Sequence, residues 1–181
     1  MKKTLLLALT MLAMFSVSAK DHDNIVSSNL GGNRFTLIEK KQPVSILMAD
    51  SDLKGVRIAA ENLQADFERV CGAKAVLNTT ATDKQCIIVG SLNSPYIQKM
   101  VKAGKLNAAD LKGKVEKYIM TVVANPIDGV EEALVIAGSD MRGTIYGIYE
   151  LSEQLGVSPW YDWMDGPVVP QRNVAIARGT Y

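Results

Sequence analysis

The spacing of apolar residues between positions 56 and 70 predicts a long amphipathic helix. Six apolar residues share one face of a helix, because they fall at offsets of 0, 3, 4, 7, 11 and 14: Val56, Ala59, Ala60, Leu63, Phe67 and Val70. Asp50 or Ser51 is a suitable N-cap, because its side-chain oxygen can accept a free N–H of the first turn. Gly72 is typical of the residue that follows a helix. We expect this helix to bury one face and expose the other.

The stretch from Ala133 to Trp163 predicts a strand, a tight turn and a second long helix. Ala133–Gly138 is a short apolar run that ends at glycine, as in a strand buried on both faces. Ser139 or Asp140 is placed to cap a helix that runs from Met141 to Leu155. The apolar stripe of this helix is expected at four positions: Ile145, Ile148, Tyr149 and Leu155.

Two glycines lie inside this second helix. Gly143 and Gly147 are four residues apart and therefore share a face. A glycine in a helix interior costs about 1 kcal/mol relative to alanine. We expect a close approach of the helix backbone to the sheet to compensate for this cost.

The remaining apolar runs predict strands and one shorter helix. We expect a hairpin from Arg34–Glu39 and Val44–Ala49, two strands at Lys74–Asn78 and Cys86–Gly90, a helix capped by Ser94 with Pro95 at its first position, and a strand Tyr118–Ala124 that pairs with Ala133–Gly138. Val174–Ala177 is either a final strand or the start of a linker. The pattern predicts an α/β fold, a two-layer domain in which two long amphipathic helices pack on a mixed β-sheet of about five to seven strands.

The first nineteen residues have the features of a secretory signal peptide. A basic start at Lys2 and Lys3 precedes an apolar run, and Val17-Ser18-Ala19 is a small-residue cleavage site. We expect an exported protein, periplasmic or extracellular. The polar residues 20–33 predict a flexible lead-in, 34–158 the α/β domain, and 159–181 a proline-rich exit segment.

The charge balance argues against several classes of partner. Lys2 and Lys3 are the only charged residues among the first nineteen, so 18 of the 20 basic groups remain to face 19 acidic ones. A near-neutral surface favours neither nucleic acid nor anionic lipid, and no later apolar run is long enough to span a membrane. The only histidine is His22, and no cysteine spacing fits zinc, so we expect no metal and no cofactor.

Cys71 and Cys86 allow two interpretations. An oxidising compartment permits a disulfide between them. The alternative is two small buried side chains, one at the end of the first long helix and one at the start of a strand. The spacing leaves both interpretations open.

The segment after the second long helix is rich in aromatic residues. Trp160, Tyr161 and Trp163 include both tryptophans of the chain. Such rings stack on sugars, and they also anchor one domain on another, because each buries about 150–250 Å². Asp162 and Asp165 lie between and after them, and glycoside hydrolysis usually uses two carboxyl groups. Without a predicted pocket, solvated loop residues are the simpler interpretation of these two acids.

Asp140 and Arg142 form a second candidate site, at the turn before the second long helix. The guanidinium of Arg142 could bind the carboxylate of a sugar acid through two hydrogen bonds. The alternative is a local ion pair between Arg142 and Asp140. The two strand–glycine–helix junctions, at Gly90 and Gly138, lack the glycine spacing of a nucleotide-binding loop and predict ordinary tight turns.

The run GSDMRGTIYGIYELSEQLGVSPWYDW resembles the N-terminal domain of glycoside hydrolase family 115, the xylan α-glucuronidases, and the preceding LKGKVEKYIMTVVANPIDGVEEALVIAG is similar to the approach to it. Members of that family tend to carry Trp at the positions of Val115 and Asp162. The resemblance implies that a (β/α)8-type catalytic barrel of the same enzyme is the partner, and that the catalytic residues lie there. It also implies xylan-type (4-O-methyl-)glucuronic acid side chains as the substrate. A free-standing carbohydrate-binding module, or a domain that docks a separate protein, is the alternative.

Overall fold

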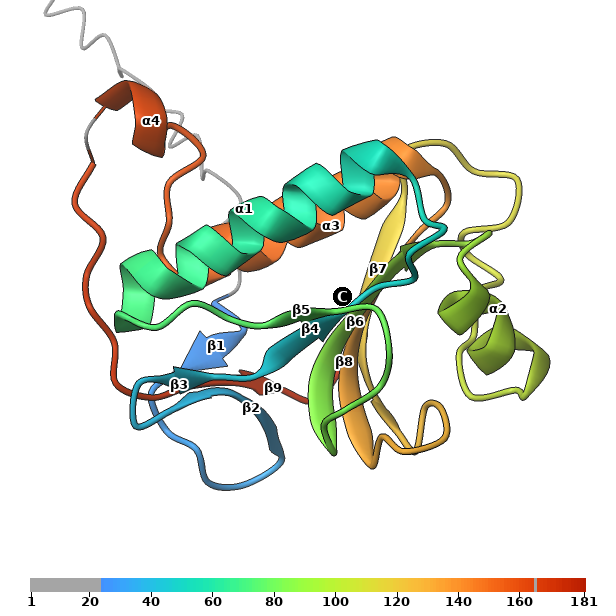
Figure 1. Ribbon diagram of the computed structural model, residues 1–181, viewed down its shortest axis with the longest axis horizontal. Coiled ribbons are helices and arrows are strands. Elements are labelled where there is room, and N and C mark those ends of the chain that lie inside the picture. The colour runs from blue at the N-terminus through green and yellow to red at the C-terminus, as the bar shows by residue number, and fades with distance from the viewer. Residues whose placement is uncertain (1–23, 165) are drawn as a thin grey trace, which may run out of the picture.

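The computed structural model describes residues 24–164 and 166–181, so the predicted signal peptide at 1–19 lies outside the described residues. The chain has the α/β fold expected from the sequence, with a mixed sheet covered by two long helices (Figure 1). The strands are divided between two sheets, one of five strands and one of four.

The central sheet has five strands in the order β5-β4-β6-β8-β7. Their bounds are β4 Ser45–Leu47, β5 Leu77–Asn78, β6 Gln85–Ser91, β7 Tyr118–Ala124 and β8 Glu132–Gly138. The first four strands in this order run parallel, and β7 runs antiparallel to β8. The predicted pairing of β7 with β8 is confirmed over its whole length, from Tyr118 opposite Gly138 to Ala124 opposite Glu132.

The second sheet is antiparallel, in the order β1-β9-β2-β3. Its bounds are β1 Val26–Ser27, β2 Arg34–Glu39, β3 Gln42–Pro43 and β9 Val174–Ala177. The end of the chain therefore returns to the domain as a strand, and part of the expected lead-in is a strand as well. The predicted exit segment 159–181 is therefore not one continuous segment that leaves the domain, because it includes the helix α4 and the strand β9.

The predicted hairpin of Arg34–Glu39 with Val44–Ala49 is wrong beyond Pro43. β2 pairs with the short β3 on one side and with β9 on the other, and the chain then crosses into the central sheet as β4. The residues of β4, Ser45–Leu47, are all buried. Such a run suits a parallel strand covered on both faces rather than the edge of a hairpin.

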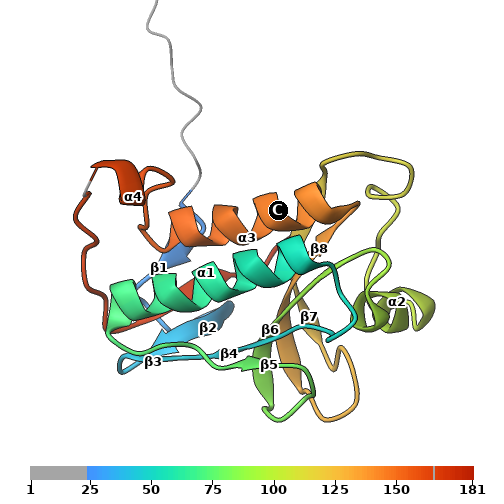
Figure 2. The same cartoon turned by 45° about the horizontal axis from the view of Figure 1, so that its top comes forward.

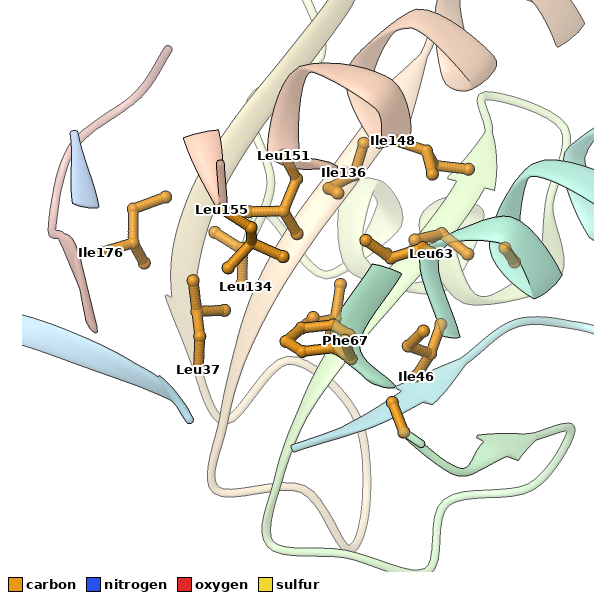
Figure 3. Close-up of a cluster of buried hydrophobic side chains, with 14 of the residues drawn as sticks. Leu37, Ile46, Leu63, Phe67, Leu134, Ile136, Ile148, Leu151, Leu155 and Ile176 are labelled. Atoms are coloured by element: carbon orange, nitrogen blue, oxygen red, sulfur yellow. The ribbon is translucent and has the colours of Figure 1, made fainter. Parts of the chain in front are cut away.

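Two long helices, α1 (Lys54–Cys71) and α3 (Met141–Gln154), lie side by side on one face of the central sheet (Figures 1 and 2). Figure 3 shows Leu63 and Phe67 of α1 and Leu151 of α3 directed toward Leu134 and Ile136 of β8. The short helix α2 (Pro95–Lys102) packs on the opposite face through Ile97 and Met100. A fourth helix of one turn, α4 (Tyr161–Met164), follows α3. Both faces of β6 and β8 are thus covered.

The helix ends agree with the sequence at three of four predicted positions. Gly72 has a left-handed backbone, φ 80°, and follows α1 as expected. Ser94 holds the N-cap position of α2, although its side chain accepts no hydrogen bond there, and Asp140 accepts a hydrogen bond from the Gly143 N–H at 2.8 Å. The prediction that Asp50 or Ser51 caps α1 is wrong, since Leu53 holds that position and no side chain of a described residue caps it.

The apolar stripe of α3 was predicted correctly except at one residue. Ile148 and Leu155 are fully buried, whereas Tyr149 is 41% exposed. Leu151 occupies the buried position instead. The Tyr149 hydroxyl accepts a hydrogen bond from the Asn62 side chain at 2.7 Å, and this bond joins the exposed sides of the two helices.

Gly143 and Gly147 lie against the sheet, as predicted. A Cβ atom at Gly143 would lie 2.3 Å from the Lys117 carbonyl oxygen. At Gly147 a Cβ atom would lie 2.7 Å from a methyl of Ile136 and 3.0 Å from the ring of Tyr118. Neither site has room for a side chain, so the close packing of α3 requires glycine at both.

Both cysteines are free, so the disulfide hypothesis is not supported. Cys71 belongs to the core beneath α1 and α3, and Cys86 to the core beneath α2 on the other side of the sheet. The second interpretation, two small buried side chains, describes them. Burial raises the pKa of Cys71, and it raises the pKa of Cys86 to about 12.

We expect Gly143→Ala to lower the free energy of unfolding by about 1–3 kcal/mol, because the new methyl group overlaps the Lys117 carbonyl and this overpacking outweighs the gain in helix propensity. Urea denaturation measures the change. Gly55→Ala is the matched control in α1, since its Cβ would meet the flexible Met141 side chain at 2.8 Å and a methyl of Ile145 at 3.4 Å, and no backbone atom. Equal stability of Gly143→Ala and wild type would contradict the close contact.

The domain is expected to lose stability between about pH 9 and pH 12, the ordinary and the folded-state pKa of Cys86. Burial, aided by the charge of Glu150, likewise raises the pKa of Tyr118 from 10.0 to about 12. A raised pKa stabilises the fold below the unfolded value, and this contribution is lost as the pH rises through the folded value.

Urea midpoints at pH 8 and pH 11 test the contribution of Tyr118. The fall in midpoint should be smaller in Tyr118→Phe than in wild type, because the substitution removes one of the two groups. Tyr149→Phe, which removes an exposed phenol, is the control and should fall as wild type does. An identical fall in all three proteins would contradict the assignment to Tyr118.

Candidate functional site

The aromatic segment, residues 158–164, projects from the end of α3 and leaves its largest side chains uncovered. Trp160 is 63% exposed, Trp163 84% and Met164 68%. Figures 1 and 2 show α4 standing apart from the sheets at one end of the helix layer. The domain's own interior does not cover these rings.

Arg69 of α1 holds this segment against the helix layer. Its guanidinium lies 4.3 Å from the centre of the Tyr161 ring, a cation–π contact. It also pairs with Asp66 at 2.6 Å and lies 3.7 Å from an Asp162 carboxylate oxygen. Burial disfavours the charge of Arg69, but the hydrogen bond with Asp66 and the two carboxylates outweigh it and raise the pKa of Arg69.

A cleft of about 340 Å³ separates the segment from α1 and α3. Its lining is mixed: it includes the polar or aromatic residues Asn62, Asp66, Arg69, Tyr149, Ser152, Ser158, Tyr161 and Asp162 and the apolar residues Val157 and Pro159. Ser152 is 4% exposed, and its hydroxyl has no hydrogen-bond partner among the described residues. The Ser152 hydroxyl oxygen is thus buried in the wall of the cleft and unpaired within the described part of the chain.

The sequence predicted the aromatic part of this site but not the residues that hold it. Trp160, Tyr161 and Trp163 were candidates from composition alone. Asp66 carried an unused signal, because it falls three residues after Leu63 on the buried stripe of α1. A carboxylate there needs a partner, and Arg69, three residues further, supplies one.

The second predicted site lies at the other end of α3. Arg142 pairs with Glu116 at 2.8 Å, and it donates a hydrogen bond to the Tyr146 hydroxyl at 2.9 Å. The predicted local pair with Asp140 is replaced by this contact. Asp140 instead accepts the N–H groups of Gly143 and Glu116, and these hydrogen bonds lower its pKa. A ligand carboxylate at Arg142 would have to displace Glu116.

The two candidate acids of the aromatic segment do not form an enclosed pair in the described structure. The Asp162 side chain is 81% exposed and lies near Arg69, whereas Asp165 lies outside the described residues. Within residues 24–164 and 166–181, no group of three or more His, Cys, Asp or Glu side chains is placed to hold a metal. In the same ranges no helix has the length and apolar character needed to cross a membrane.

The fold, with a helix layer on a mixed sheet and an uncovered aromatic segment, is that of an N-terminal accessory domain of a glycoside hydrolase. The chain belongs to the family described as glycosyl hydrolase family 67 N-terminus, whose sequence model matches residues 33–151. A search of curated proteins gave no match.

Among solved structures, the chain is similar to BtGH115A, described as a novel family GH115 4-O-methyl-α-glucuronidase with specificity for decorated arabinogalactans. The identity is 31% and the TM-score 0.66, over 81% of this chain and 18% of that chain. The resemblance read from the sequence is thus confirmed, and the chain spans less than a fifth of that relative. A structure of CpGH84D has 8% identity and a TM-score of 0.45 over 84% of this chain and 22% of that chain.

We expect Tyr161→Leu to loosen the aromatic segment without unfolding the domain, because the substitution removes a cation–π contact worth about 0.5–1 kcal/mol. Hydrogen exchange at the amides of Trp163 and Met164, which bond to the Trp160 carbonyl, should accelerate about threefold. Tyr146→Leu on α3 is the matched control and should leave these amides unchanged. Unaltered exchange in Tyr161→Leu would show that Arg69 does not hold the segment.

Proposed function

We propose that this chain is the non-catalytic N-terminal domain of an exported glycoside hydrolase that removes (4-O-methyl-)glucuronic acid from polysaccharide side chains. The family match and the similarity to a 4-O-methyl-α-glucuronidase support the class of enzyme. The sequence resemblance favours xylan as the polysaccharide, and the solved relative is described as specific for decorated arabinogalactans. The signal-like sequence of residues 1–19 supports export.

The observation that carries the proposal is the exposed aromatic segment. Each tryptophan ring contributes about 150–250 Å² when it is covered. Further exposed apolar side chains belong to the helix layer or to the residue before it: Leu53, Ile58, Met141, Tyr146 and Tyr149. Apolar surface gathered on one layer is typical of an interaction surface. We assign its cover to the catalytic portion of a longer chain.

The chemistry of the described residues supports a non-catalytic role. Glycoside hydrolysis usually needs a carboxylic acid and a second carboxylate on either side of the scissile bond. Asp162 is paired with Arg69 on the surface, and Asp66 is buried against the same guanidinium. The two acids face the same guanidinium and do not flank an open site as a catalytic pair would. The catalytic pair is therefore assigned to the portion that covers this domain.

One alternative is supported by the same rings. Exposed tryptophans also stack on sugars, so the chain could bind a polysaccharide directly. The two functions differ in which binding partner requires Trp160 and Trp163. A docking domain binds the catalytic portion through them, and a carbohydrate-binding module binds the polymer through them.

We expect the chain to associate with a truncated BtGH115A that lacks the part matching this domain. The double variant Trp160→Ala, Trp163→Ala should weaken this association at least about 30-fold, because the loss of central tryptophans typically has an effect of this size in interfaces. Calorimetry measures the affinity. Val76→Ala, Val115→Ala is the control, because it removes exposed apolar groups elsewhere on the domain.

The same proteins are tested on glucuronoxylan and on arabinogalactan. The chain alone should hydrolyse neither and bind neither. Absence of association with the catalytic portion, together with tryptophan-dependent binding to either polymer, would replace the docking function by the carbohydrate-binding one.

A further inference from the structure

The outer edge of β7 is the longer of the two edges of the central sheet. β7 has seven residues, whereas β5, at the other edge, has two. An edge strand presents unpaired N–H and C=O groups, which can pair with a further strand. Strand addition at such an edge is a recurring mode of peptide recognition, because main-chain hydrogen bonds supply the contact. The edge of β7 is therefore the place where the sheet can accept additional backbone.

The last residues of the chain already pair with part of this edge. The Met120 N–H donates to the Tyr181 carbonyl and the Tyr181 N–H to the Met120 carbonyl, both at 2.9 Å. Thr121 lies opposite Thr180 in an antiparallel bridge, and their hydroxyl oxygens are 3.1 Å apart. The Thr121 hydroxyl also donates to the Gly179 carbonyl at 2.9 Å. The end of the chain thus begins a further strand, antiparallel to β7.

The register identifies the next backbone groups along this direction. In an antiparallel ladder every second residue directs its N–H and C=O to the same neighbour, so Tyr118 faces the same edge as Met120. Gly138, which is opposite Tyr118 in β8, directs its carbonyl away from β7, to the Leu92 N–H at 2.8 Å. Within the described residues neither backbone group of Tyr118 has a hydrogen-bond partner. An unpaired donor and acceptor therefore lie directly beyond Tyr181.

A cleft of about 410 Å³ lies along the same edge. Its lining includes Ile119 and Thr121 of β7, Leu106 and Asn107 of the connector after α2, and Thr180. Directly opposite residues of a ladder share a face of the sheet, and so do residues two apart in one strand. A residue that follows Tyr181 and lies opposite Ile119 would therefore direct its side chain toward this cleft, as Thr180 does.

We propose that the residues that directly follow Tyr181 in a longer chain extend this strand along β7. The proposal rests on the proposed function, which requires a longer chain, and it adds the path by which that chain leaves the domain. BtGH115A has the length for such a segment, since 81% of this chain covers 18% of that one. The first following residue lies opposite Ile119, and the second pairs its N–H and C=O with those of Tyr118.

The direction of this strand determines where the longer chain leaves. Tyr118 is opposite Gly138, the last residue of β8 before the turn into α3. The segment therefore leaves near the pair of Glu116 and Arg142, at the end of α3 that lies away from the aromatic segment. The aromatic segment is then a contact surface for the catalytic portion, and the covalent connection to that portion lies at the other end of the helix layer.

The full chain extended after Tyr181 by Thr-Val-Thr tests the register. Hydrogen exchange at the Tyr118 amide should be about threefold to tenfold slower than in the chain without the extension, the range for one backbone hydrogen bond. Proline as the second added residue lacks the N–H that pairs with Tyr118, so it should abolish this protection. Proline as the first added residue is the matched control and should keep it, because that N–H points away from β7.

Intact BtGH115A tests the segment of a longer chain. Proline at the second position after the residue that matches Tyr181 should accelerate exchange at the amide that matches Tyr118, about threefold to tenfold. Proline at the first position should leave that amide unchanged. Exchange of the peptide that contains it is measured by mass spectrometry.

The outcomes separate this proposal from the proposed function. Unchanged exchange at Tyr118 in the extended chain, or equal exchange in the two proline variants of BtGH115A, overturns the added strand even where the chain associates with truncated BtGH115A. Protection that does not depend on the position of proline, with a mass that rises with concentration, would show that two copies pair through β7 and would also overturn it. Protection in the expected register in both proteins supports the added strand, and it does so independently of Trp160 and Trp163.

Discussion

The close contact between α3 and the central sheet is the constraint on which the rest of the structure depends. Gly143 and Gly147 let the backbone of α3 lie directly against the Lys117 backbone and against the side chains of Tyr118 and Ile136. α1 then packs beside it, and the two stripes of apolar residues close one core with β6 and β8 (Figure 3). A larger residue at either glycine would push α3 away from the central sheet and loosen the packing of the core between them.

The same contact fixes the two ends of α3 relative to the sheet. At the first end, Asp140 and Ser139 bind the backbone of residues 116 and 117 and tie the preceding loop to the helix. At the other end, the chain leaves as the aromatic segment, which Arg69 of α1 secures. The exposed rings are therefore carried by a rigid layer, and a partner meets a surface that is already ordered. Such order lowers the entropy that association would otherwise cost.

The parts of the fold that the sequence predicts are those whose contacts are local. The stripe on α1, its end at Gly72, the cap at Asp140 and the pairing of β7 with β8 all follow from residues near one another in the chain. Long-range contacts were not predicted. The crossing of β4 into the central sheet, the return of β9 and the stacking of Arg69 on Tyr161 join residues between about 40 and 140 positions apart. No periodicity in a single segment encodes such contacts.

Asp66, a carboxylate on the buried stripe of α1, is the sequence feature from which part of the candidate site could be predicted. A carboxylate on a buried stripe costs stability unless a partner compensates it, and a buried pair seldom stabilises more than apolar residues would. Asp66 is thus a poor choice for stability alone, since leucine would fill the stripe. Its effect is to fix the Arg69 guanidinium between α1 and the aromatic segment, where one side pairs with Asp66 and the other contacts Tyr161 and Asp162. The buried acid is therefore best explained by the position of the exposed rings, which ties the interior of the helix layer to its proposed docking surface.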